Sequence, residues 1–353
     1  MKYQPLRFFS LFLFVLILAS CDSSSSDSSE QYGIFPAENL DRARNYALAD
    51  QNSALLIWHD GGLILEEYRF SNPKTAHPIF SGTKSFAGIL AAIAVRDGLF
   101  TFDTKLGDLI ESWDPETERG SVTVRELLNL TSGIETAPVG AFQGQTPEVW
   151  LNAPMAFERG TTFVYGPTPF YLLANIFIDT FSINPANYLN EQLFDPLGLS
   201  RPVWQINLAG SIPNLSFGVF YPAFDWLQIG LMLLNNGTLN GTTIIPPDIF
   251  SELLQPSDAA PAYGVSFWLN KPIVPGTDFY NRLPGGTGSS GDGFLISSAA
   301  PADTYMKSGA FGQKLYVIPS LNVVIVRFGP VGEFFSDHQF FTRLMQGVEA
   351  PTI

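Results

Sequence analysis

Cysteine and histidine are nearly absent from this chain of 353 residues, which holds one of the first and three of the second. Cys21 has no partner with which to form a disulfide within the molecule. Neither a His-Glu-x-x-His pattern nor a cysteine cluster occurs, so the common zinc-binding motifs are missing. We therefore expect a protein that holds no metal and uses no cofactor.

Basic residues are also scarce, with 19 lysines and arginines against 33 aspartates and glutamates. Without Lys2 and Arg7, which lie in a leading segment, 17 basic residues face 33 acidic ones, a formal balance of −16. So little positive charge argues against binding to nucleic acid or anionic lipid through a basic surface. The Gly-x-x-x-x-Gly-Lys loop that cradles phosphates is absent as well.

The chain has only one long apolar run, Leu11 to Leu18, and this run is too short to span a bilayer comfortably. It follows two basic residues and ends in Leu18-Ala19-Ser20-Cys21, which is similar to the lipobox of bacterial lipoproteins. The pattern predicts a signal peptide over residues 1–20, a lipidated Cys21 and a serine-rich tether over residues 21–34. We expect a lipid-anchored protein of the bacterial cell envelope, facing the periplasm or the exterior.

The remaining residues, 35–353, are enough for one large domain with a substantial core. Apolar residues alternate near both ends of this part, which predicts strands, and recur three and four apart between them, which predicts helices. The expected strands are a hairpin at 53–69 and single strands at 263–269, 314–319 and 322–328. The expected helices are at 37–49, 124–128, 170–178, 226–234 and 337–348.

This order of elements predicts an α+β fold. Sequential hairpins form antiparallel sheets, so strands at both ends of the chain favour one antiparallel sheet built from the two termini. We expect one domain over residues 35–353, whose sheet part covers about residues 35–100 and 260–353. Helices should flank the sheet, and a helical insertion should cover about residues 101–259.

A further helix is predicted to follow Ser81, because apolar residues recur three and four apart from Phe86 to Ile93 and Gly98 closes the run. Lys84 then lies one turn along the same face as Ser81. The hydroxyl would lie near free amides at the positive end of the helix dipole, with the lysine close enough to take its proton. A free lysine has a pKa of about 10.4, but burial or a second cation lowers that pKa towards neutrality. The plainer alternative is that Ser81 only caps the helix.

Histidine is the more usual base for a serine nucleophile, and the sequence disfavours it. His59 lies in the predicted hairpin turn, His77 precedes a proline close to Ser81, and His338 opens the last helix. No Gly-x-Ser-x-Gly elbow occurs, which argues against a Ser-His-Asp hydrolase of the α/β type.

Two more motifs follow Ser81-x-x-Lys84 along the chain. Tyr165 stands in a turn before an apolar helix, and Lys307-Ser308-Gly309 leads into the final strand pair. With these motifs the chain resembles the penicillin-recognising serine hydrolases: class C β-lactamases, serine D-Ala-D-Ala peptidases, esterases and 6-aminohexanoate-dimer hydrolases. The resemblance runs from about residue 35 to 350 and implies a β-lactamase/transpeptidase-like fold. Three further segments match the family in order: Leu127 to Gly133, Phe194 to Leu199, and Gly312 to Pro319.

The resemblance also implies a role for each matching residue. Ser81 would attack the substrate carbonyl and become an acyl-ester, while Lys84 and Tyr165 would share the general-base work. The backbone amides of Ser81 and Ala310 would form the oxyanion hole. Substrate would be held by the third motif, which comprises Lys307, Ser308 and Gly309.

The third motif would act through charge. Lys307 and Ser308 would offer positive potential and a donor to a substrate carboxylate. Lys307 would also lower the pKa of Tyr165 and Lys84.

One position departs from the family pattern. The second motif of β-lactamases and peptidases is Tyr-x-Asn, whereas Pro167 stands at the third position here. Proline has neither a polar side chain nor a backbone N–H, so it cannot replace the amide that contacts the catalytic lysine and the substrate. This substitution favours an esterase, or an amidase with different positioning, over a β-lactamase.

We therefore predict a serine hydrolase, held at a membrane by lipidated Cys21, that cleaves small ester, amide or peptide substrates through Ser81 and binds no nucleic acid. Two alternatives stay open. One is a non-catalytic binding lipoprotein of the cell envelope on the same fold. The other is a genuine β-lactamase or D-Ala-D-Ala peptidase in which another group replaces the lost amide contact.

Overall fold

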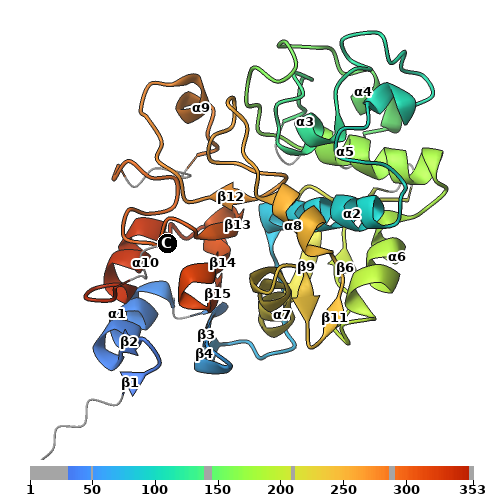
Figure 1. Cartoon of the computed structure of the whole chain (residues 1–353). Coiled ribbons are helices and arrows are strands. Elements are labelled where there is room, and N and C mark those ends of the chain that lie inside the picture. The colour runs from blue at the N-terminus through green and yellow to red at the C-terminus, as the bar shows by residue number, and fades with distance from the viewer. Residues whose placement is uncertain (1–30, 49–50, 139–144, 208–210, 286–290, 350–353) are drawn as a thin grey trace, which may run out of the picture.

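Strands from the two ends of the chain form one six-stranded antiparallel sheet in the computed structural model (Figure 1). The structure describes residues 31–48, 51–138, 145–207, 211–285 and 291–349. Across the sheet the order is β12 (Trp268–Leu269), β13 (Tyr305–Gly309), β14 (Gln313–Ile318), β15 (Val323–Phe328), β3 (Ser53–His59) and β4 (Gly62–Arg69). Each neighbouring pair is antiparallel. The predicted α+β class, with a sheet built from both termini, is confirmed.

Helices cover both faces of this sheet (Figure 1). Leu315 and Tyr316 are consecutive in β14, so their side chains point to opposite faces. Leu315 lies against α7 (Ala223–Leu234), where a Cβ on Gly230 would stand only 2.7 Å from its Cδ1 atom. Tyr316 stacks on Phe340 of α10 (Asp337–Leu344), with ring centroids 6.1 Å apart. Since α1 (Ala37–Ala47) packs beside α10, the sheet is the middle of three layers.

The chain between the sheet halves folds mainly into helices. In α2 (Lys84–Arg96) the residues from Lys84 to Ala94 are all buried, and this helix contacts α5 (Thr168–Asn175) and α8 (Pro247–Leu253). Our sequence division placed α2 with the sheet part and α7 with the helical part, but α2 packs among helices and α7 packs on the sheet. The two parts therefore share one core.

The remaining described elements are short. The helices are α3 (Val124–Leu128), α4 (Pro147–Leu151), α6 (Pro185–Leu189) and α9 (Asp278–Asn281), and the strands that bear on the site are β5 (Ala76–Pro78), β6 (Val203–Trp204) and β9 (Val219–Pro222). The other described strands form three two-residue pairs: β1 (Gln31–Tyr32) with β2 (Phe35–Pro36), β7 (Ile206–Asn207) with β8 (Ile212–Pro213), and β10 (Thr238–Leu239) with β11 (Thr242–Thr243).

The prediction of a strand at 263–269 is wrong over most of that range, because only the two residues of β12 pair with β13. Instead, Gly264 N donates to Phe267 O at 2.8 Å, which closes a turn, and Ser266 takes the left-handed region at φ +67°. All residues from Ala262 to Asn270 are buried. A buried loop can therefore show the apolar pattern of a strand. The other predicted elements are present with shifted ends, and the last helix stops at Leu344 rather than at 348.

Candidate active site

Ser81 lies in a single 3₁₀ turn, Phe80–Thr83, that leads directly into α2. Strand β9 holds this turn from the side: Ile79 N donates to Val219 O at 3.0 Å, and Val219 N donates to Thr83 Oγ1 at 3.1 Å. Phe80 has φ +46°, a left-handed conformation that is strained for an aromatic residue. Local strain beside a serine whose turn is anchored on both sides is typical of a functional site.

Lys84 contacts Ser81 directly. Its Nζ atom donates to Ser81 Oγ at 3.2 Å and to Ser216 O at 3.0 Å. The side chain is 4% exposed and its Nζ atom lies 4.8 Å from the centroid of the Tyr165 ring. Because burial disfavours the charged form, the pKa of Lys84 falls to about 7. The residue thus has the geometry and the pKa of a proton acceptor for the Ser81 hydroxyl.

The contact with Ser216 O shows how the chain supports Lys84 without the usual amide. Pro167 precedes α5, where its carbonyl accepts from Phe170 N at 3.0 Å, and it offers the site no donor. The Ser216 carbonyl instead comes from a loop that the buried Asn214 organises, since Asn214 Oδ1 accepts from Ser216 N at 3.0 Å. Sequence reasoning missed Ser216, because a backbone acceptor 132 residues away has no side-chain signature.

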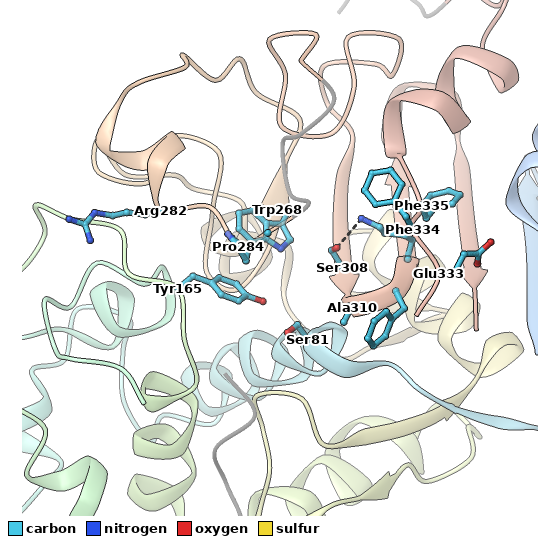
Figure 2. Close-up of a pocket in the computed structure, with 15 residues that line it drawn as sticks. Ser81, Tyr165, Trp268, Arg282, Pro284, Ser308, Ala310, Glu333, Phe334 and Phe335 are labelled. Carbon is cyan, nitrogen blue, oxygen red and sulfur yellow. Dashed lines mark hydrogen bonds between the residues drawn. The ribbon is translucent and has the colours of Figure 1, made fainter. Parts of the chain in front are cut away.

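Tyr165 completes the group around the serine. Figure 2 shows its hydroxyl directed towards Ser81, to which it is hydrogen-bonded, and its ring stacks on Trp268 with centroids 5.6 Å apart. Burial raises the pKa of Tyr165 to about 12, while the hydrogen bond from Ser81 opposes that rise. We expected Lys307 to lower this pKa, so the direction is opposite to the prediction.

Ala310 and Ser81 line the same cavity, as the predicted oxyanion hole requires. β13 approaches the serine turn closely enough that a Cβ on Gly309 would stand 2.0 Å from Ile79 O. Only glycine permits this approach, which brings Ala310 up to Ser81 (Figure 2). The third residue of the Lys307-Ser308-Gly309 motif is therefore needed for packing as well as for any contact with substrate.

Lys307 does not line this cavity. It pairs in register with Leu315, whose side chain faces α7, and its ammonium donates to Ser266 O at 3.1 Å above the Phe267 ring. Burial lowers its pKa well below the usual value. The structure thus brings Ser81, Lys84, Tyr165, Ser308, Gly309 and Ala310 together around one cavity or its wall, but turns Lys307 away from it.

The cavity has a volume of about 490 Å³ and an aromatic wall. Trp268 and Phe334 line it beside Ser81 and Tyr165 (Figure 2). Phe311 also lines it. Lys314 lines it too, opposite Ser308 across the strand pair, with Nζ 2.9 Å from Ser308 Oγ. These residues were not among those predicted from the sequence. Only the register of Ser308 with Lys314 could have been anticipated, from the predicted hairpin.

None of the three histidines lines this cavity. The His77 ring packs against that of Phe328, with centroids 4.8 Å apart, and burial lowers the pKa of His77, so this residue has a packing role. His338 Nδ1 contacts both Ser297 and Asp292, at 3.1 and 2.7 Å. Although these are triad residue types, Ser297 is fully buried and both partners meet one ring nitrogen, which is not a triad geometry.

Within the described ranges, no three His, Cys, Asp or Glu side chains lie close enough to hold a metal ion. No helix of the described part is long and apolar enough to cross a bilayer. The predicted signal peptide, Cys21 and most of the tether lie outside the residues that the structure describes.

Residues 48–213 match the protein-family model described as "Beta-lactamase". In Escherichia coli (strain K12), a "Putative D-alanyl-D-alanine carboxypeptidase" is 24% identical over 206 residues, which cover 53% of this chain and 44% of that protein. The match therefore spans less than half the length of this curated relative.

Solved structures share the fold at low identity. A "putative beta-lactamase from Bacteroides dorei" superposes with a TM-score of 0.66 at 15% identity, covering 85% of this chain and 93% of the other. A "Putative 6-aminohexanoate-dimer hydrolase from Bacillus anthracis" superposes with a TM-score of 0.64 at 18% identity, covering 85% and 79%. The predicted β-lactamase/transpeptidase-like fold is confirmed, and so is the resemblance to its serine hydrolases.

Proposed function

We propose that this chain of β-lactamase fold is a serine hydrolase that cleaves small ester or amide substrates through an acyl-enzyme on Ser81. The observation that carries the proposal is the contact between Ser81 and Lys84, a buried lysine whose pKa lies at about 7. A buried lysine is costly, and a protein that only binds ligand has no need of one beside a serine at a cavity wall. This contact argues against the non-catalytic alternative.

The first half of the reaction forms the acyl-enzyme. Ser81 Oγ bonds to the substrate carbonyl carbon as its proton passes to the neutral amine of Lys84. The negative charge that develops on the carbonyl oxygen is met by the backbone N–H groups of Ser81 and Ala310. The bond to the leaving group then breaks, and that group takes a proton from Tyr165, which Lys84 resupplies. Tyr165 suits this donor role because its pKa of about 12 keeps the hydroxyl protonated.

The second half reverses these steps with water. Water attacks the acyl-ester carbonyl and gives up a proton to Lys84, and Ser81 Oγ leaves with a proton returned by the same pair. Pro167 offers no amide to a substrate here, and Lys84 Nζ donates to the backbone carbonyl of Ser216. The lack of a side-chain amide at Pro167 favours esters and simple amides over β-lactams as substrates.

The pH dependence of kcat/KM should report the pKa of Lys84. The base must be unprotonated, so kcat/KM should rise with pH through about 7 and drop roughly tenfold per unit below that value. No fall due to Tyr165 is expected on the alkaline side before about pH 10, because its pKa is about 12. Initial rates on a neutral ester, corrected for uncatalysed hydrolysis, measure the profile. A flat profile, or one that falls above pH 7, would show that Lys84 is not the base.

Intact-mass spectrometry after incubation with a fluorophosphonate tests the proposal. The full chain, kept in detergent, should gain one fluorophosphonate adduct, and Ser81→Ala should gain none. A parallel incubation with a penicillin should give little or no adduct, because the amide lost at Pro167 is one that holds β-lactams. An unlabelled, folded wild type would contradict the hydrolase, and a stable penicillin adduct would favour the penicillin-binding alternative.

We further propose that the mature chain begins at lipidated Cys21 and faces the periplasm or exterior. The proposal rests on the apolar run that ends in Leu18-Ala19-Ser20-Cys21. The same mass measurement on protein purified from bacterial membranes checks it. A lipid-bearing N-terminus at Cys21 is expected, and an intact Met1 would refute the anchor.

A further inference from the structure

The charged side chains that line the active-site cavity are each matched by an opposite charge of the protein itself. Among the described residues of the cavity wall these are Lys314, Arg282 and Glu333. Lys314 Nζ lies 2.9 Å from Asp337 Oδ2, and both side chains are less than one-tenth exposed. This buried pair is also held from outside the cavity, since the hydroxyl of Tyr316 donates to the other oxygen of Asp337.

The other two charges are also paired, and the carboxylates in these pairs are more exposed than Asp337. Arg282 Nε lies 2.8 Å from Asp278 on the preceding turn, and its guanidinium stacks on Phe157 at 4.5 Å. Glu333 receives a hydrogen bond from the fully buried Arg327. The described cavity wall therefore carries no charge that lacks a protein partner.

The two remaining lysines near the site offer no free cation either. Lys84 is deprotonated when it acts as a base, and its amine points at Ser81. Lys307 lies on the opposite face of the strand from Ser308 and is bonded to Ser266 O. The cation that the family resemblance assigned to a substrate carboxylate is thus absent from the described cavity wall.

What the wall does present is aromatic surface. Phe334 is 73% exposed and Phe311 is 37% exposed, and both line a cavity that Trp268 also lines. Large exposed rings gathered at one cavity favour apolar groups of a ligand. Ser308 adds one polar contact: its hydroxyl accepts from Lys314 at 2.9 Å, so its proton is free to point to substrate.

We propose that this site selects uncharged substrates, and that the Lys314–Asp337 pair is the specificity determinant that makes it do so. Asp337 cancels the charge of Lys314, so a carboxylate near the scissile bond would lose water and gain no counter-ion. The substrate class is neutral esters or amides with apolar groups that pack on Phe311, Phe334 and Trp268. This inference rests on the proposed hydrolase activity.

A pair of matched esters tests it. The full chain is assayed with 4-nitrophenyl valerate and with mono-4-nitrophenyl glutarate, which differ mainly by a terminal carboxylate. We expect kcat/KM to favour the neutral ester by about 100-fold, the scale of burying an uncompensated charge. Ser81-dependent turnover of both esters at similar kcat/KM would overturn the specificity and leave the hydrolase standing. If the protein hydrolyses neither ester, both the proposed hydrolase activity and the proposed specificity are overturned.

Variants of the ion pair separate a charge effect from a change in shape. Asp337→Asn frees the charge of Lys314 and should raise kcat/KM for the anionic ester, relative to the neutral one, by about tenfold. Asp103→Asn, which removes an exposed carboxylate outside the cavity, is the matched control and should leave the ratio unchanged. Lys314→Met covers the case in which Asp337→Asn fails to fold. It should keep the preference for the neutral ester, whereas a lost or reversed preference would contradict the proposal.

Discussion

Ser81→Ala should lower kcat/KM for a neutral 4-nitrophenyl ester by about 10⁴–10⁶-fold, the range found when the nucleophile of a serine hydrolase is removed. Ser81 carries the hydroxyl that Lys84 Nζ contacts, at 3.2 Å, so its removal leaves the proposed base without a nucleophile to activate. Steady-state kinetics on wild type and variant, purified in the same way, measure the loss. The melting temperature should change little, because one oxygen atom of a half-buried side chain is removed.

Ser85→Ala is the control for this experiment. Ser85 lies one turn further along, is buried, and donates to Gly82 O at 2.6 Å rather than facing the cavity. Its loss should weaken the start of α2 slightly and should leave most of the activity. Equal activity losses in the two variants would show that the serine turn has only a structural role. Full activity in Ser81→Ala would rule out the acyl-enzyme.

Lys84→Met should reduce kcat by about 10²–10⁴-fold, the typical contribution of a positioned general base. The same variant should be more stable than wild type, by about 1–4 kcal/mol, because apolar groups often replace buried charged groups favourably. The reason is the burial of Lys84, which lowers its pKa to about 7 and makes the charged form costly in the folded state. Loss of activity with gain of stability is the signature of a residue retained for chemistry.

The sign of the pH effect on stability follows from the same pKa. Between about pH 7 and 10.5 the unfolded chain binds a proton at Lys84 that the folded chain has released. Stability contributed by this site therefore rises with pH across that window, and below about pH 7 it no longer changes. The free energy of unfolding, measured by chemical denaturation at several pH values, should rise less steeply with pH in Lys84→Met than in wild type.

Lys74→Met serves as the matched control, because it removes an exposed lysine of the same chain. Its activity, its stability and the pH dependence of its stability should all stay close to those of wild type. If Lys84→Met were less stable than wild type and Lys74→Met were not, the lysine would be a structural hydrogen-bond donor to Ser216 O.

Much of the site could be predicted because its elements are local. Ser81 and Lys84 are three residues apart at the start of a helix, and helical geometry alone puts them on one face. Tyr165 and Gly309 were found by their place in an ordered set of motifs. The hairpin at 53–69 and the strand pair β14–β15 follow from alternation and short turns, so the sheet itself was predictable.

The parts that could not be predicted depend on contacts between distant segments. Ser216 O contacts Lys84 from 132 residues away in the sequence. Asp337, at the start of α10, contacts Lys314 from 23 residues away. Motif matching assigned Lys307 to the substrate, but β13 alternates, so the strand that directs Ser308 to the cavity must turn Lys307 away. The apolar pattern at 263–269 misled for a related reason: a buried loop and a strand are equally apolar.

The sequence by itself determined the α+β class and the placing of Ser81 and Lys84 on one face at the start of a helix, because these follow from periodicity and from spacing within one helical turn. The catalytic roles that we propose for both residues came from the resemblance to a family. Only the tertiary structure decided the electrostatics of the cavity. Burial sets the pKa of Lys84, and packing against α10 brings Asp337 onto Lys314. Desolvation and ion pairing depend on which segments meet in space, and no local pattern encodes that meeting.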